Sequence, residues 1–176
     1  MDLRRLTEPD AAEYRELRLR ALREHPDAFT SSFEEEQLKP IDWSRQRLGP
    51  RSEAPHDFIL GAYAGGKLVG ILGMSVEART KVRHIGEVFG MYVAPEHAGR
   101  GVGRLLVDAC IARARETGLE RLRLTVTDSN ARAKSLYERA GFRAFGLERN
   151  AVKIGERYFD KCHMALSLRP ATPGGD

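Results

Sequence analysis

The sequence predicts a single α/β or α+β domain built around one central sheet, and three observations support this. Several short runs alternate apolar and polar residues, as strands do, while others repeat apolar residues at helical spacing. The second half of the chain has the order strand–helix–strand–helix–strand, which packs helices against a sheet. The 176 residues are enough for one domain with a core. We expect this domain to occupy residues 1–168, with a disordered tail at 169–176.

The N-terminal part predicts a strand, a helix and a less regular region. Residues 1–6 can form the strand, and the TEPD that follows fits a capping box, in which Thr7 and Asp10 would begin the next helix. Apolar residues at helical spacing continue that helix through AAEYRELRLRAL, and Pro26 ends it. For residues 27–57, which include a Pro/Arg/Ser-rich stretch, we expect one or two short helices and a mobile loop.

The rest of the chain predicts alternating strands and helices. Apolar runs on both sides of Ala64–Lys67 indicate a hairpin, and GEVFGMYV indicates a strand that Pro95 closes. The helix VGRLLVDACIARARET ends at Gly118, and the strict alternation of RLRLTVT predicts another strand. A DSN run can cap the short helix ARAKSLYERA, which Gly141 ends. Two strands, around RAFGLERNAV and RYFDKCHMALSL, are joined across residues 153–156.

Composition and charge narrow the class of protein. Hydrophobic residues make up 41% and charged residues 31%, as in soluble globular proteins. We expect a cytoplasmic protein, because no apolar run is long enough to span a membrane and the N-terminus lacks the apolar core of a signal peptide. The net charge is +4, and basic residues are denser than acidic ones between Arg100 and Arg143, which suits a polyanionic ligand. Nucleic acid is disfavoured, because no basic block is interleaved with aromatic residues.

Cysteine and histidine usage predicts no metal site. Cys110 and Cys162 form no CxxC pair and have no histidine pattern beside them, so buried free thiols are expected. The five histidines are scattered along the chain.

The run PEHAGRGVGRLL lies between a predicted strand and a predicted helix. It is not a GxxxxGK[ST] loop, and a GxGxxG loop would need a glycine at position 104 or 106. Gly99, Gly101 and Gly103 would let the backbone approach a ligand closely, while the free N–H groups of the first helical turn face an anion. The run therefore predicts an anion site; the alternative is a turn that only connects strand and helix.

Two motifs carry a resemblance to a known family. VAPEHAGRGVGRLLVDACIARA resembles the acyl-CoA-binding motif of the GNAT N-acetyltransferase superfamily, V-x-P-x-x-[RQ]-G-x-G-[VI]-G-x-x-L. NARAKSLYERAGF resembles the second hallmark of that superfamily, N-x-x-A-x-x-L-Y-x-x-x-G-F. The two stand in the expected order, and with the flanking strands the resemblance covers residues 58–168. It implies the GNAT fold, a single mixed central sheet flanked by helices on both faces.

The resemblance also implies acetyl-CoA as cosubstrate, lying between the strands at 88–93 and 122–127. The backbone of Met91, Tyr92 and Val93 would pair with the pantetheine arm, and an N–H near Met91 would polarise the thioester carbonyl. The pyrophosphate would be held mainly by backbone amides of the loop formed by Ala98, Gly99, Arg100, Gly101, Val102, Gly103 and Arg104.

One position departs from the family pattern. Ala98 stands where an Arg or Gln is usual, and we expect this to weaken binding only modestly, because backbone amides supply most of the contact. The side chains of Arg100 and Arg104 remain available to the phosphates. Asn130 would bond the pantetheine or hold the loop; its alternative role is a helix N-cap, and the two roles are compatible.

Two residues are candidates for catalysis. By resemblance, Tyr137 would protonate the departing CoA thiolate; alternatively its ring belongs to the core. Glu87, at a position where some family members carry a catalytic glutamate, would accept the proton of the attacking ammonium, usually through water. The alternative for Glu87 is an ordinary strand carboxylate paired with an arginine. Neither cysteine lies in a motif for a covalent intermediate, so direct attack is expected.

The identity of the acceptor is not readable from the sequence. The resemblance implies a site lined by the first helix region, residues 78–84 and the closing hairpin. The acidic run Phe33–Gln37, against the alternative of a solvated helix face, and three hairpin residues are candidates for holding a cationic amine: Glu156, Tyr158 and Asp160.

The sequence thus predicts an N-acetyltransferase that moves an acetyl group from acetyl-CoA to a primary amine, either a small molecule or a protein amine. Its partners would be acetyl-CoA and the acceptor, with no metal, nucleic acid or membrane. The alternative is a non-catalytic sensor that binds acyl-CoA. In such folds a homodimer through the closing hairpin is common, so that assembly is a further expectation of the resemblance.

Overall fold

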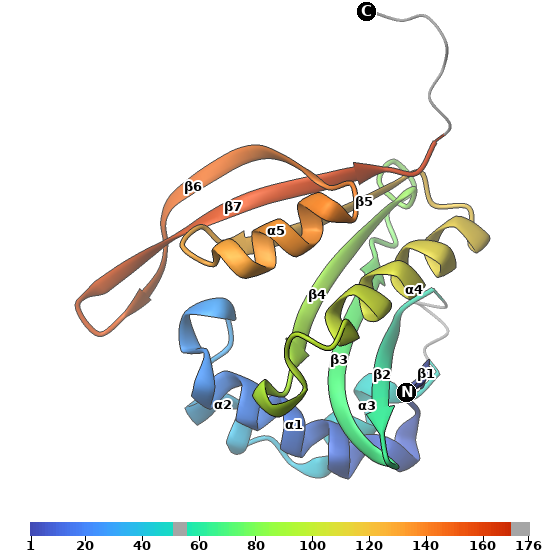
Figure 1. The fold of residues 1–176 in the computed structure, drawn as a ribbon, viewed down its shortest axis with the longest axis vertical. Helices are drawn as coiled ribbons and strands as arrows, with labels where there is room; N and C mark the ends of the chain where they lie inside the picture. The colour runs from blue at the N-terminus through green and yellow to red at the C-terminus, as the bar shows by residue number, and fades with distance from the viewer. Residues whose placement is uncertain (51–55, 170–176) are drawn as a thin grey trace, which may run out of the picture.

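The computed structural model describes residues 1–50 and 56–169. Its strands form one seven-stranded sheet in the order β1-β2-β3-β4-β5-β7-β6 (Figure 1). All neighbours are antiparallel except β4 and β5, which are parallel. The strands are β1 Asp2–Arg5, β2 Phe58–Ala64, β3 Lys67–Val76, β4 Ile85–Val93, β5 Arg121–Thr127, β6 Arg143–Ile154 and β7 Arg157–Ser167.

Helices cover both faces of the sheet (Figure 1). One face, called here the α1 face, carries α1 and α3, and the opposite α4 face carries α4 and α5. The helices are α1 Ala11–Glu24, α2 Phe33–Gln37, α3 Ile41–Leu48, α4 Val102–Glu116 and α5 Ala131–Arg139, with short 3₁₀ turns η1 Glu8–Asp10, η2 Pro26–Ala28 and η3 Pro95–His97. The predicted fold class is confirmed.

Two cores form because successive strand residues point to opposite faces. On β3, Ile71 packs beneath α1, whereas Leu72 and Met74 pack beneath α4. All three are almost fully buried. The strands in the middle of the sheet are therefore apolar on both sides, which explains why FILGAYA and KLVGILGM read as nearly continuous apolar runs.

Most of the elements expected from the sequence are present, with two differences at their ends. The Thr7–Asp10 capping box forms, but it begins the turn η1, which leads directly into α1. The closing hairpin is longer than expected, because β6 continues to Ile154 and only a two-residue turn separates it from β7. The tail at residues 170–176, and residues 51–55 of the expected mobile loop, lie outside the described residues.

The parallel strands β4 and β5 pair over only part of their length. Their register runs from Ile85 opposite Arg121 to Val88 opposite Leu124. Beyond that point β4 continues to Val93 and β5 to Thr127 without pairing to each other. We call the region in which β4 and β5 do not pair with each other the fork. It comprises residues 89–93 of β4 and 125–127 of β5. In Figure 1 the two strands diverge there.

A bulge at Gly90 shapes the β4 side of the fork. Gly90 has φ of +63°, and the register between β3 and β4 shifts at the same place. One extra residue reverses the alternation of faces. Phe89 therefore packs on the α1 face, while both Met91 and Val93 lie on the α4 face, with Tyr92 between them on the α1 face.

Candidate active site

The glycine-rich loop connects β4 to α4 and has the backbone geometry of an anion site. Gly99 and Gly101 have φ of +77° and +80°, which L-residues with side chains rarely adopt, and Gly101 is the N-cap of α4. No side chain caps this helix, and its first turn carries no acidic residue. The first amides of α4 are thus left for an external acceptor, and the helix dipole favours a negative one.

Side chains near the loop differ in their freedom to reach phosphates. Arg104 lies 2.7 Å from the carboxylate of Asp108 and donates to the carbonyl of Arg139 at 2.9 Å, so it joins α4 to α5. Arg100 is exposed, and its side chain makes no hydrogen bond or ion pair within the described chain. Ala98 is partly buried and contributes no polar side chain. Of the two arginines proposed from the sequence, Arg100 is the one free to turn toward a phosphate.

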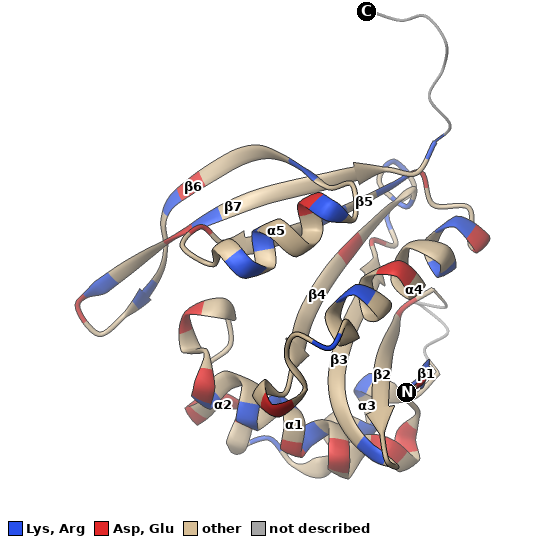
Figure 2. Cartoon of the chain, in the orientation of Figure 1, with Lys and Arg blue, Asp and Glu red and all other residues tan. Residues whose placement is uncertain are grey.

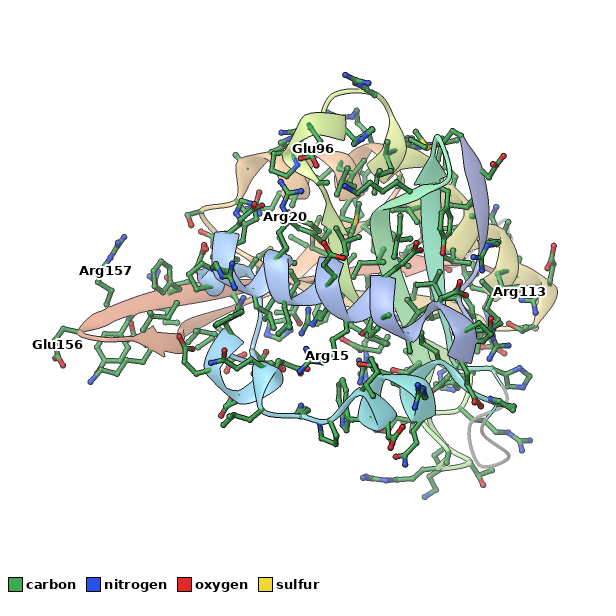
Figure 3. All side chains as sticks on the ribbon, turned by 90° about the horizontal axis from the view of Figure 1, so that it is seen from below. Arg15, Arg20, Glu96, Arg113, Glu156 and Arg157 are labelled. Carbon is green, nitrogen blue, oxygen red and sulfur yellow. The ribbon has the colours of Figure 1, made fainter. Side chains whose placement is uncertain are left out.

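An ion pair and close packing hold the loop in place. A Cβ at Gly103 would lie 3.0 Å from Cε of Met91 and 3.2 Å from Cδ2 of Leu136, so the start of α4 packs tightly on β4 and α5. On the other side, Arg20 of α1 pairs with Glu96 of η3 at 2.7 Å; Figure 3 shows the two side chains directed toward each other. The loop is therefore anchored to elements on both faces.

Tyr137 approaches the fork from the α4 face. Its side chain is 7% exposed, and its ring stands edge-on to Phe142 with 5.8 Å between ring centroids. The hydroxyl donates to Sδ of Met91 at 3.2 Å, and burial raises the pKa of the phenol. The phenol is therefore protonated at neutral pH and is directed at a β4 residue of the fork. The core packing weighed in the sequence analysis is also present.

Glu87 lies on the opposite face. It alternates in step with Phe89, which packs on the α1 face, whereas Val88 packs on the α4 face. Its carboxylate accepts a hydrogen bond from Arg123 of β5 at 2.8 Å, and the two side chains are 40% and 42% exposed. The arginine partner considered as an alternative is thus observed, and Glu87 remains open to solvent at the wall of a cavity.

Asn130 caps α5. Its Oδ1 accepts from the amide of Ala133 at 3.0 Å, which is the N-cap role. It lies three residues after Thr127, the end of the β5 segment of the fork, so the cap also sets where α5 begins relative to the fork.

Two cavities open on the α1 face. The first, of about 540 Å³, adjoins the fork: its walls include Phe89 and Gly90 of β4 and Thr125 of β5, together with Arg18, Phe29 and Arg47. The second, of about 730 Å³, is lined by Ala78, Arg123 and Phe145 among others. Glu87 and Thr125 line both cavities. A molecule in the first cavity would therefore reach the fork from the side opposite Tyr137.

Several of the acidic residues suggested for the acceptor have partners elsewhere. In α2, Glu35 accepts from the amide of Ser32, and Glu36 bonds Nζ of Lys39 at 3.0 Å. Asp160 accepts from the amide of Asn150, and Glu156 is at the tip of the projecting hairpin (Figure 3). None of the residues proposed for this role lines either cavity.

The first cavity is lined by three cationic side chains that the sequence analysis did not predict: Arg18, Arg47 and Lys161. The position of Arg18 in the sequence did indicate an unusual role. It lies four residues after Tyr14 and three before Ala21, on the buried stripe of α1, where an arginine is unexpected. Arg47 and Lys161 carried no comparable signal, because their neighbours in space are distant in sequence.

The cysteines and the helices of the described residues bear on further expectations. Cys110 and Cys162 are buried free thiols, as expected. Within residues 1–50 and 56–169, no group of three His, Cys, Asp or Glu side chains is placed to hold a metal ion, and no helix has the length and apolarity to cross a membrane. Figure 2 shows basic residues on α5 and at the beginning of α4, beside the glycine-rich loop.

Comparison with known proteins identifies the class. The model of the acetyltransferase (GNAT) family matches residues 17–142, and the chain belongs to this family. An acetyltransferase of the GNAT family from Streptococcus pneumoniae has the same fold, with a TM-score of 0.86 and 28% identity over 94% of this chain and 98% of that one. A ribosomal-protein-alanine N-acetyltransferase from Brucella melitensis has a TM-score of 0.83 and 25% identity, covering 95% and 99% of the two chains.

Particular relatives differ in the share of their length that is matched. The mycothiol acetyltransferase of Propionibacterium freudenreichii subsp. shermanii is 38% identical over 99 residues, which is 56% of this chain and 31% of that protein. The N-alpha-acetyltransferase RimI of Mycobacterium tuberculosis is 34% identical over 112 residues, 64% of this chain and 68% of that protein. The chain thus spans about a third of the length of that mycothiol acetyltransferase.

Proposed function

We propose that the protein is an N-acetyltransferase that transfers the acetyl group of acetyl-CoA to a primary amine by direct attack. The observation that carries this proposal is the fork, which has a cavity at its α1 face and the buried phenol of Tyr137 at its α4 face. Donor and acceptor can therefore meet between β4 and β5 from opposite sides. Family membership supports the same reaction.

The residues present fit the proposed cosubstrate. The uncapped start of α4 offers amides to the pyrophosphate, and Arg100 can add a charge. The β4 edge at Met91, Tyr92 and Val93, which has no partner strand in the fork, can pair with the amide groups of the pantetheine arm. An N–H near Met91 would polarise the thioester carbonyl.

Proton transfers can be assigned to the two faces. The amine nitrogen attacks the carbonyl carbon, and the C–S bond breaks as the C–N bond forms. Glu87, through water, would accept the proton lost by the amine, and Tyr137 would protonate the thiolate sulfur and regain a proton from solvent. Holding both reactants in the fork supplies a further part of the rate enhancement through proximity.

Thermal unfolding tests cosubstrate binding. A ligand at 100 times its Kd stabilises the folded state by about 2.7 kcal/mol, and each kcal/mol is worth roughly 2–4 °C in a protein of this size. We expect acetyl-CoA to raise the Tm accordingly, while adenosine, which lacks the pyrophosphate and pantetheine, does not. An unchanged Tm at saturating acetyl-CoA would refute the proposal.

Release of CoA over a panel of amines tests turnover. The panel includes amino acids, polyamines, aminoglycosides and peptides with free N-termini, and we expect acceptor-dependent release for at least one class. Stabilisation by acetyl-CoA with no release across the panel would instead favour the non-catalytic sensor. A cytoplasmic location and a homodimer through the β6–β7 hairpin stay predictions, to be checked by cell fractionation and by light scattering.

A further inference from the structure

The first cavity has an excess of cationic side chains. Arg18, Arg47 and Lys161 line it, against the carboxylates of Asp57 and Glu87. An amine acceptor by itself would not favour this lining, because an ammonium is repelled by arginine. The cationic side chains of this cavity therefore point to a second, anionic group on the ligand.

Arg18 lines the cavity and stacks on an aromatic ring. Its guanidinium stacks on the ring of Phe29, 4.6 Å from the centroid, and Nη1 lies 3.9 Å from the position that a Cβ of Gly90 would occupy. Nη1 is buried and makes no hydrogen bond within the described residues. A buried donor left unpaired lowers the stability of a protein, so Nη1 calls for a partner from outside the described chain, either water or a ligand.

Arg47 comes to the same place from α3. Its guanidinium lies 4.9 Å from the centroid of Phe89 and 5.1 Å from that of Trp43, and its Nε is buried without a hydrogen-bond partner among the described residues. Two guanidinium groups from different helices thus reach the same cavity, each oriented by aromatic rings. Both are beside the bulge that opens the fork.

The carboxylates that line the cavity, and Glu36, have other partners. Glu87 accepts from Arg123, and Glu36, whose charge also acts on Arg18, bonds Lys39. Asp57 accepts from the amide of Val76 through Oδ1. Among the described residues, no hydrogen bond joins any of these three carboxylates to Arg18.

Lys161 has a structural role. Its Nζ donates to the carbonyls of Asp27 and Ala28 and to Oγ1 of Thr127, at 2.9, 3.3 and 2.9 Å. These bonds fasten η2 to the end of β5. The donors left for a ligand are therefore those of the two arginines.

We infer that the acceptor carries a carboxylate besides its amine, and that Arg18 and Arg47 bind this carboxylate in the first cavity while the amine reaches the fork. A planar guanidinium matches a carboxylate with two parallel hydrogen bonds, and the partial burial of Arg18 and Arg47 strengthens them. The inference rests on the proposed function and specifies its substrate class, amines that carry a carboxylate.

Turnover of matched pairs tests the inference. Amino acids whose amine and carboxylate are separated by one to five carbons are compared with their primary amides, which keep the amine and lose the charge. We expect kcat/KM to be at least tenfold higher for one or more acids than for the matching amide. Arg18→Met and Arg47→Met should each abolish this preference. Turnover of the amides equal to that of the acids would overturn the inference and leave the proposed function intact.

Binding without turnover provides an independent test. With acetyl-CoA bound, hexanoate should raise the Tm more than hexanamide does, and Arg18→Met should remove the difference. Equal effects of the two probes would refute the carboxylate subsite, whether or not any amine is acetylated. The matched control is Arg23→Met, because Arg23 is on the same helix and stacks on Phe33 at 4.5 Å but does not line the cavity. We expect this control to keep the preference for the acid.

Folding of the variants is itself informative. Because Arg18 has a buried donor with no partner within the described chain, Arg18→Met should unfold at the same temperature as the wild type or higher when no ligand is present. A large loss of stability would show that Arg18 serves the fold and would contradict its assignment to a ligand. Arg18→Lys keeps the positive charge but loses the paired N–H donors of the guanidinium. This variant should retain part of the preference for acids.

Discussion

Tyr137 and Glu87 approach the fork from opposite faces of the sheet, and their surroundings suit different proton transfers. Tyr137 is buried against Phe142 and bonds a thioether sulfur, so its proton is retained until a stronger acceptor arrives. Glu87 is half-exposed, so its carboxylate is accessible to water. This asymmetry arises because successive residues of β4 point to opposite faces of the sheet, which places Glu87 on the α1 face. Tyr137 belongs to α5, which covers the α4 face.

The role of Tyr137 can be tested by removing its hydroxyl. Tyr137→Phe keeps the ring contact with Phe142 and loses only a hydrogen bond to Met91, so the free energy of unfolding should change by less than about 1 kcal/mol. We expect kcat to fall by about 10² or more while the Kd for acetyl-CoA stays within a factor of two. Steady-state kinetics and titration calorimetry measure the two effects. Unchanged kcat would show that another group protonates the thiolate.

Ala98 provides a test in the direction of tighter binding. Ala98→Arg restores the residue type usual in the family, and a charge-assisted hydrogen bond to phosphate adds about 1.5 kcal/mol, or about tenfold in affinity. The backbone there is extended, with φ of −66°, and tolerates any side chain. The Kd for acetyl-CoA should fall while kcat is unchanged. No tightening in Ala98→Arg would mean that position 98 does not face the phosphates.

Gly101→Ala should have the opposite effect on the loop. It should raise the Kd for acetyl-CoA, because the φ of +80° at this position is strained for alanine.

At the scale of elements, β4 has two functions along its length. Its first half pairs with both β3 and β5, and its second half pairs only with β3. The Gly90 bulge occurs at this change, and it places Met91 toward α5 and Phe89 toward the first cavity. The bulge therefore sets which side chains face the two sides of the fork, where we propose that donor and acceptor bind.

Substitution of Gly90 tests this function against backbone strain alone. Gly90→Ala should cost roughly 1–2 kcal/mol of stability, because an alanine disfavours a φ of +63°. The control is Gly155→Ala in the hairpin turn, where φ is +57° and an added Cβ meets no atom within 4 Å. Both variants should unfold at similar temperatures, but only Gly90→Ala should lower kcat, by tenfold or more. Equal kcat in the two variants would separate the bulge from catalysis.

For the whole molecule, buried ionisable groups determine how stability depends on pH. Burial raises the pKa of Cys110 and of Tyr63 to about 12, and it also raises the pKa values of Tyr92 and Tyr137. The unfolded chain loses these protons first, from about pH 8.5 for the thiol and about pH 10 for the phenols. Stability from these groups is therefore complete below those values and decreases as the pH rises, by up to about 1.4 kcal/mol per group per pH unit.

On the acid side the sign is reversed. Hydrogen bonds from Arg20 lower the pKa of Glu96 to about 2, and those from Arg4 lower the pKa of Asp10. Their contribution is present above pH 4 and is lost as the pH falls. We expect the Tm to be level from about pH 5 to 8 and to fall on both sides. Cys110→Ala should make the alkaline decline less steep above pH 8.5; an identical slope would contradict the burial of that thiol.

The sequence by itself determined the features that depend on neighbouring residues in the chain. Helical and strand periodicities, the glycine spacing of the loop, the cap at Asn130 and the two family motifs are local, so they predicted the fold class, the anion loop and the position of Tyr137. They also indicated Glu87 and its alternative arginine partner, but not that the partner is Arg123.

Only the tertiary structure decided where distant segments meet. The end of β4–β5 pairing depends on how two strands separated by α4 pack against the helices, and the Gly90 bulge depends on the register with β3. The meeting of Arg18 and Arg47 beside that bulge requires α1, α3 and β4 to be assembled. Burial and convergence are properties of packing between residues far apart in the sequence, whereas local patterns report only the preferences of a few consecutive residues.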